Sequence, residues 1–305
     1  MIVVSIFAAI FLIHIFSLIL NKKCSNILSS KGSAGKAVYV LITGIFSGFL
    51  YFAYSGFSLE INSTCILYAF LYGICSTIAG ITITIYKYAD VATVSVTKSS
   101  LSLILTSLVG FIIFSEPVTE SRIIKILLTL AVVFIVFINS RREITQNTKN
   151  NVSASQKRHN FLMFSLLIGI QLPVFVFGAY QSKMVAKFNA VPDLNSYYCL
   201  TNLFMLLFAL IWIAVLTAKD KDGIKECISV VKSKSIFVIL SLLVIGTFSA
   251  ILGIVILKYI DISLYSPLNS ALTFIASALV SLLFREKLSK LVWLAVAISI
   301  IAVII

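Results

Sequence analysis

The feature that most constrains this chain is a series of long apolar runs. Ten runs of 17 to 24 residues follow one another with short breaks. The hydrocarbon core of a bilayer is about 30 Å thick and takes roughly 20 residues of helix to cross. None of the runs alternates apolar and polar residues, so helices are favoured over the strands of a barrel. We therefore predict an all-α integral membrane protein with ten transmembrane helices, at 2–20, 37–56, 64–86, 91–114, 121–139, 161–182, 196–217, 235–257, 262–284 and 289–305.

Composition leads to the same class. Apolar residues make up 60% of the chain and charged residues 11%, and so few polar side chains cannot cover a water-exposed surface. The net charge of +13 lies in short clusters between the runs, which is typical of membrane orientation rather than nucleic-acid binding. The predicted partner is the lipid bilayer. Frequent lysine, isoleucine and asparagine indicate an AT-rich bacterial genome, so we expect the inner or plasma membrane of a bacterium.

Lysine and arginine are unevenly divided between the two sets of connections. Eighteen lie in or beside the odd-numbered connections and five in or beside the even-numbered ones, while Lys98 lies inside a run. Positive residues concentrate on the cytoplasmic side of a membrane. The count therefore predicts that both termini face away from the cytoplasm.

A short polar motif occurs twice in the same setting. "KYADVATVSVTK" begins at Lys87 and "KYIDISLYSPLN" begins at Lys258, 171 residues later, and each joins two apolar runs. Further along, "GFIIFSEP" aligns with "SLLFREK", which places Glu116 over Glu286. The chain is therefore predicted to contain two copies of one unit.

The copies define the expected domain organisation. We predict five-helix repeats at 1–140 and 161–305, joined by a polar cytoplasmic linker at 141–160 that lacks apolar periodicity. Because each repeat has an odd number of spans, the second enters the membrane upside down. Inverted repeats of this kind are typical of transporters that work by alternating access.

These elements resemble the drug/metabolite transporter superfamily, in its ten-helix EamA-like branch. In that family, each half has a helix that ends in an aliphatic-Lys-Tyr segment and a next helix that ends in an aliphatic-Gly-Glu turn. The matching segments are "IYKYAD" and "FSEPVT" in the first half, and "LKYID", "SPLN" and "FREKLS" in the second. The resemblance implies a central cavity lined by the first, third, fourth, sixth, eighth and ninth helices.

The chain departs from the family pattern at a few positions. The usual glycine before the glutamate is Ser115 in one copy and Arg285 in the other, and the proline early in the fourth helix of a half occurs only as Pro267. Members of the family often have cytoplasmic termini, in conflict with the charge count. We keep the charge count for the orientation.

Lys98 is the first candidate for substrate binding, because an ionisable group inside hydrocarbon is costly and usually functional. It lies two turns into its run, and its repeat partner is Asn269. Both could face the cavity and bind an anionic or zwitterionic group. Alternatively, the Lys98 side chain could extend along its helix towards the membrane surface.

Three further residues are cavity candidates. Pro267 frees a backbone carbonyl about one turn earlier, and carbonyls of broken helices often line transporter sites. Ser266 precedes it and aligns with Ser95 of the first copy. Gln171 lies two residues before Pro173 in the sixth run, which repeats the association of a polar group with a kink.

The acidic residues are expected to be structural. All eleven lie in connections or within about one turn of a run's end, which argues against a membrane-embedded carboxylate for proton coupling. Lys87 with Asp90, and Lys258 with Asp261, are spaced for local ion pairs across their turns. Glu116 and Glu286 are expected to brace the turn into the helix that follows each of them.

The sequence offers no basis for catalysis or a cofactor. No nucleophile–base pair, metal-binding motif or phosphate-binding glycine loop occurs in any connection. The five cysteines form no CxxC pair and are expected to pack in apolar surroundings. We therefore expect no enzyme activity, no metal and no cofactor.

The sequence leads to three hypotheses about function. The first is a secondary transporter that exports a small polar or zwitterionic metabolite, for example an amino acid, with a homodimer possible. The second is an importer or exchanger of an anionic metabolite or sugar. The third, from another class, is a membrane scaffold or partner subunit that does not transport.

Overall fold

The structure is a computed structural model of the whole chain. It describes the backbone of residues 2–115, 118–146, 151–187, 190–219, 223–232, 235–256, 262–286 and 288–304.

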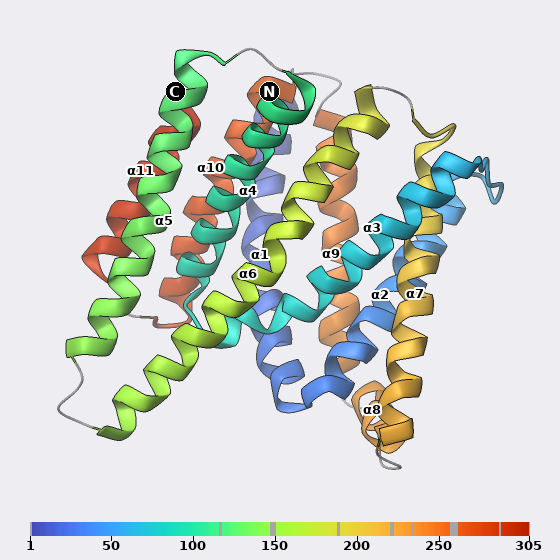
Figure 1. Cartoon of the computed structure of the whole chain (residues 1–305), viewed down its shortest axis with the longest axis horizontal. Helices are drawn as coiled ribbons and strands as arrows, with labels where there is room; N and C mark the ends of the chain where they lie inside the picture. Colours follow the sequence, from blue (N-terminus) through green and yellow to red (C-terminus); the bar gives the residue numbers. More distant parts are fainter. Residues whose placement is uncertain are drawn as a thin grey trace. The chain divides into compact units, whose positions relative to one another are not determined.

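The described chain is built from helices, and no strand occurs in these ranges. Figure 1 shows them as a set of long rods joined by short connections. The helices are α1 Ile2–Ser30, α2 Gly32–Tyr54, α3 Ser63–Ile81, the 3₁₀ helix η1 Thr82–Lys87, α4 Val91–Phe114, α5 Glu120–Gln146, α6 Asn151–Lys187, α7 Leu194–Lys219, α8 Gly223–Lys232, α9 Ser235–Ile256, α10 Ile262–Leu283 and α11 Lys290–Ile304.

Six segments of the described chain are long and apolar enough to cross a membrane. They lie in α1, α2, α3 with η1, α4, α6 and α7. The described parts of α5, α9, α10 and α11 contribute shorter apolar helices. The chain is therefore all-α and has the character of a multi-pass membrane protein, while the number of ten spans stays a prediction.

Helices extend further than the apolar runs indicate. α1 continues ten residues past its predicted end, through "NKKCSNILSS" to Ser30. That segment contains no glycine or proline to stop a helix, and it buries Cys24 and Leu28. Helix also covers much of the predicted linker, because α5 runs to Gln146 and α6 begins at Asn151.

The chain forms two compact units. The first unit comprises Met1–Lys22, Ile85–Gly169 and Ile245–Ile305, and the second comprises Lys23–Thr84 and Ile170–Val244. Each unit takes segments from both predicted repeats, so the units do not coincide with 1–140 and 161–305. The duplication itself stays a prediction.

Four helices form most of the first unit. α4 packs against α5 and α10, and α11 packs against α5 and α10, as the left part of Figure 1 shows. Their shared core includes Val96 of α4, Val136 of α5, Phe274 of α10 and Ala295 of α11. Helices that align in the predicted repeat, α4 with α10 and α5 with α11, are thus in direct contact.

Glycines allow close contact between helices in the second unit. A Cβ atom at Gly44 of α2 would lie 3.0 Å from the Leu206 nitrogen and 3.1 Å from the Asn202 oxygen of α7. A Cβ at Gly73 of α3 would lie 2.8 Å from the Phe204 Cβ. Gly44 is part of the Gly-x-x-x-Gly pair with Gly48, a spacing used for helix packing in membranes.

We predict that Gly44→Ala destabilises the second unit. The added methyl group would meet backbone atoms of α7, which can move only with the whole helix, so a loss of about 1–3 kcal/mol is expected. Thermal unfolding of purified protein in detergent measures it. The control is Gly178→Ala, where a Cβ meets nothing within 4 Å; equal melting temperatures for the two variants would contradict the prediction.

Candidate functional site

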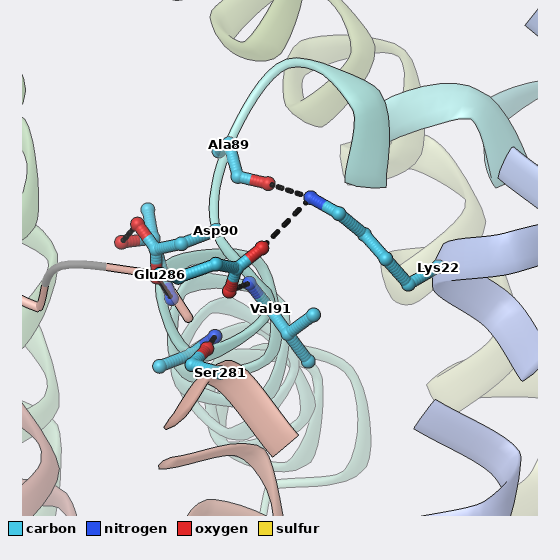
Figure 2. A network of polar contacts seen from close by, with 8 residues as sticks. Lys22, Ala89, Asp90, Val91, Ser281 and Glu286 are labelled. Atoms are coloured by element: carbon cyan, nitrogen blue, oxygen red, sulfur yellow. Dashed lines mark hydrogen bonds and ion pairs between the residues drawn. The ribbon is translucent and has the colours of Figure 1, made fainter. Parts of the chain in front are cut away.

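The N-terminus of α4 has its free amide donors satisfied by three side chains. The first N–H groups of a helix have no partner within the helix. Here the Val91 amide donates to Glu286 Oε2 at 2.9 Å, and the Ala92 amide donates to Ser281 Oγ at 2.9 Å. The Thr93 amide donates to Asp90 Oδ1 at 2.6 Å. Figure 2 shows Glu286 and Ser281 of the α10 end beside this helix start.

Lys22 of α1 completes the cluster. Its Nζ lies 2.9 Å from Glu286 Oε1 and donates to the Ala89 carbonyl at 3.1 Å, and Figure 2 shows it reaching both groups. The side chains of Lys22 and Glu286 are 14% and 15% exposed, so each charge depends on the other. Glu286 thereby connects α1, the start of α4 and the end of α10.

The end of α10 has the geometry that places Glu286. The Glu286 amide donates to the Ser281 carbonyl and the Arg285 amide donates to the Leu282 carbonyl, both at 2.9 Å. This is the paired hydrogen-bond pattern of a Schellman motif, which needs a left-handed residue after the helix. Arg285 is that residue, with φ 56°, and Ser115 at the end of α4 has φ 49°. Two positions that align in the predicted repeat, Ser115 and Arg285, are therefore both left-handed.

The structure corrects two expectations about the turns. Among the described residues, the Glu286 carboxylate binds the start of α4 and Lys22 and not the helix after it. There, Ser289 Oγ accepts from the Val292 amide. Lys87 and Asp90 do not form an ion pair, because Asp90 caps α4 and the Thr93 hydroxyl donates to its Oδ2 at 2.6 Å. The exposed Lys87 lies over the Tyr88 ring.

Asp90 is a perturbed carboxyl. Burial raises its pKa, hydrogen bonds from Thr93 lower it, and the charge of Glu286 raises it, with a net rise above the usual range. The folded chain thus holds this proton more tightly than the unfolded chain. The protonated Asp90 therefore stabilises the fold. This contribution is complete when the pH is below the pKa of Asp90 in the unfolded chain, and it is lost as the pH rises through the higher pKa of the folded chain.

Lys98 lies on α4, two turns beyond this cluster. Its Nζ is 6.0 Å from the centre of the buried Tyr86 ring, within the range of a cation–π contact. Among the described residues it has no carboxylate partner, in contrast to Lys22. A partly buried ammonium with no counter-ion among the described residues is suited to bind an anion.

Hydroxyl groups accompany Lys98 along α4. The side chains of Ser95, Thr97 and Ser100 are buried, and the hydroxyl oxygens of Thr97 and Ser100 have no hydrogen-bond partner within the described part of the chain. Ser95 precedes Lys98 by three residues and so lies on the same side of the helix, whereas Thr97 and Ser100 lie on other sides. An ammonium beside donor hydroxyls can hold a carboxylate or phosphate oxygen.

The repeat partners of these residues are only partly described. Three of them belong to α10, but the structure describes only their backbone and not their side chains: Ser266, Pro267 and Asn269. Lys258 is outside the described residues. Asp261 and Glu116 are outside as well. The structure thus brings Lys98 onto a helix that packs against the helix of Asn269, and the role of Asn269 stays a prediction.

Gln171 is a buried polar residue of the second unit. It is 3% exposed, and its Nε2 donates to the Thr82 hydroxyl, which donates to the Ala79 carbonyl at 2.8 Å. The Gln171 Oε1 atom has no partner in the described ranges. The amide nitrogen of Gln171 therefore joins α6 to the end of α3, while its amide oxygen is still able to accept a hydrogen bond.

Sequence reasoning missed Lys22 and Ser281. Lys22 is one of several basic residues after the first apolar run, and Ser281 is one of many serines in apolar helices. The sequence indicated this site only through the alignment of Glu286 with Glu116, which is an acidic position repeated in both copies. It did not identify the partner, because Val91 is 195 residues away in the chain.

Neither a comparison with known proteins nor a search for metal-binding residues assigns a function to the site. No protein-family model matches the chain, and no curated protein matches it. In the described ranges, no group of three or more histidine, cysteine, aspartate or glutamate residues could hold a metal ion. The five cysteines are free thiols.

We predict that Lys22 and Glu286 are energetically coupled. Lys22→Met or Glu286→Gln alone leaves a largely buried charge unpaired and is expected to cost about 1–2 kcal/mol, since some solvent screening remains. The double variant should cost less than the sum of the two. Thermal unfolding measures all three. Lys23→Met, at the exposed neighbouring lysine, is the control and should be neutral; a Lys22→Met variant just as neutral would refute the coupling.

We also predict that Arg285→Gly stabilises the first unit. Glycine has no Cβ to strain a left-handed backbone, so a gain of up to about 1 kcal/mol is expected. Arg285→Ala keeps the Cβ and removes the charge, and it should not give this gain. Unfolding curves of the two variants measure the difference, and identical curves would show that the left-handed position carries no strain.

Proposed function

We propose that the chain is a secondary membrane transporter of the drug/metabolite type. Its substrate is a small polar or zwitterionic metabolite with an acidic group, such as an amino acid, and the direction is export. The mechanism is alternating access of ten helices arranged as two inverted five-helix repeats.

Three observations support the inverted repeat. The helices that align in the repeat contact one another, α4 with α10 and α5 with α11 in the first unit. α4 and α10 each begin one residue after the aspartate of a Lys-Tyr-x-Asp motif, at Val91 and Ile262. Both end close to an aligned left-handed residue, Ser115 or Arg285.

The observation that carries the proposal is the environment of Lys98. An ammonium in an apolar helix costs free energy, and a protein normally offsets that cost with a counter-ion. Lys22 has one in Glu286, whereas Lys98 has only the face of Tyr86 among the described residues. A substrate anion would complete the site, and the Ser95 hydroxyl on the same side of α4 would donate to it.

The same environment narrows the substrate class. The Lys98 ammonium and the Ser95 hydroxyl, three residues before it on the same side of α4, can both donate hydrogen bonds. This fits a carboxylate or phosphate and disfavours a lipophilic cation. The ammonium group of a zwitterion would need an acceptor, and Asn269, the repeat partner of Lys98, has an amide oxygen that can serve. An ion or substrate gradient would supply the energy.

We predict that Lys98→Met strongly lowers transport without loss of folding. A hydrogen bond to a charged group contributes about 1.5–3 kcal/mol, so removing it should lower the export rate by about tenfold or more at low substrate concentration. Mass spectrometry of medium and cytoplasm from cells that produce the protein measures the movement of metabolites. Lys98→Arg, which keeps the charge, should retain part of the activity.

The control is Lys290→Met, which removes an exposed lysine at the start of α11. It should transport like the wild type. A metabolite that accumulates inside the cell in a Lys98-dependent manner would reverse the direction and favour the importer. If neither pool changes while both proteins are folded in the membrane, the transporter proposal fails and the scaffold remains.

A further inference from the structure

The short helix α8 has three different faces. Cys227 and Val230 are buried against Ala34 and Val38 near the start of α2. Ile228 and Val231 are 45% and 41% exposed, although both are aliphatic. On the next face, Lys225 and Lys232 are exposed and lie seven residues apart, which places them on the same side of the helix.

This order of faces is typical of a helix that lies in the interface of a membrane. One side is buried on the protein, the exposed aliphatic side chains can enter the acyl region, and the lysines can reach the headgroups. A helix in water would be expected to place polar side chains where Ile228 and Val231 lie. α8 is also too short, at ten residues, to cross a bilayer.

Further lysines surround α8 in the second unit. α8 packs against α2 and α7, and Lys31 precedes α2 while Lys219 ends α7. Both of these lysines are exposed, and Lys36 in the first turns of α2 is partly exposed. We call these five residues the basic collar: Lys31, Lys36, Lys219, Lys225 and Lys232.

Acidic residues offset only part of this charge. The segment 219–234 contains five lysines with Asp220, Asp222 and Glu226, and the segment 21–36 contains four lysines and no acidic residue. The collar thus carries a net positive charge beside an exposed aliphatic face. The lysine and arginine count of the whole chain also predicts that these connections face the cytoplasm, where anionic lipids concentrate.

We propose that α8 and the basic collar form a binding surface for anionic phospholipid, with the acyl chains against Ile228 and Val231 and the phosphate at the lysines. This surface belongs to the second unit and includes neither Lys98 nor the Glu286 cluster. The proposal therefore stands whether or not the chain is a transporter.

Native mass spectrometry of the full-length protein tests the proposal. The protein is purified from bilayers that contain equal amounts of phosphatidylglycerol and phosphatidylcholine, and the lipids that stay bound are counted. The wild type should retain phosphatidylglycerol in preference. Lys225→Gln/Lys232→Gln should lower that preference at least fivefold, because each lysine near a headgroup contributes measurably to binding.

The control is Lys87→Gln/Lys290→Gln, which removes two exposed lysines of the first unit and should keep the preference. Equal retention of both lipids by the wild type would overturn the proposal, as would an equal loss in the control. A dimer that dissociates in Lys225→Gln/Lys232→Gln would also overturn it, since the surface would then bind a second copy. Matching melting temperatures exclude misfolding of either variant.

Discussion

The first unit depends on how a buried helix start satisfies its hydrogen-bond donors. Val91 and Ala92 are fully buried, and neither lipid nor the helix itself offers an acceptor for their amide groups. An unpaired buried amide costs about 1–3 kcal/mol. The Asp90 carboxylate accepts from Thr93, so the acceptors for Val91 and Ala92 come from elsewhere in the chain: Ser281 of α10 and Glu286 in the turn that follows it.

Supplying those acceptors creates a second requirement, which Lys22 and Arg285 meet. A carboxylate at a helix start is favoured by the helix dipole, but the largely buried Glu286 also needs a positive partner, and Lys22 is 2.9 Å away. The left-handed Arg285 turns the chain so that Glu286 follows α10 directly. The need to pair the two free amides at the start of α4 thus explains three features of the first unit. They are the ion pair of Glu286 with Lys22, the left-handed Arg285 and the contact of α4 with α10. α4 then holds Lys98 at a fixed depth.

The sequence predicted what depends on neighbours in the chain and missed what depends on distant ones. Helices follow from long apolar runs. The cap by Asp90 is also local, since Asp90 lies directly before a run, although the sequence predicted an ion pair of Asp90 with Lys87 instead. The partner of Glu286 could not be predicted, because nothing near residue 286 indicates Val91. α8 could not be predicted for a different reason. Lysines interrupt its aliphatic residues, so its sequence has the pattern of neither a transmembrane helix nor a soluble amphipathic helix. Its buried face becomes recognisable only from its contacts with α2.

The packing of aligned helices has a consequence for folding. If the two predicted repeats were independent domains, α4 and α5 would find their core partners within 1–140. Instead the core that contains Val96 and Val136 also contains Phe274 of α10 and Ala295 of α11. The acceptors for Val91 and Ala92 lie in the second half as well. Residues 1–140 alone would therefore leave both apolar surface and buried amides without partners, so the first half cannot reach this structure before the second half is present.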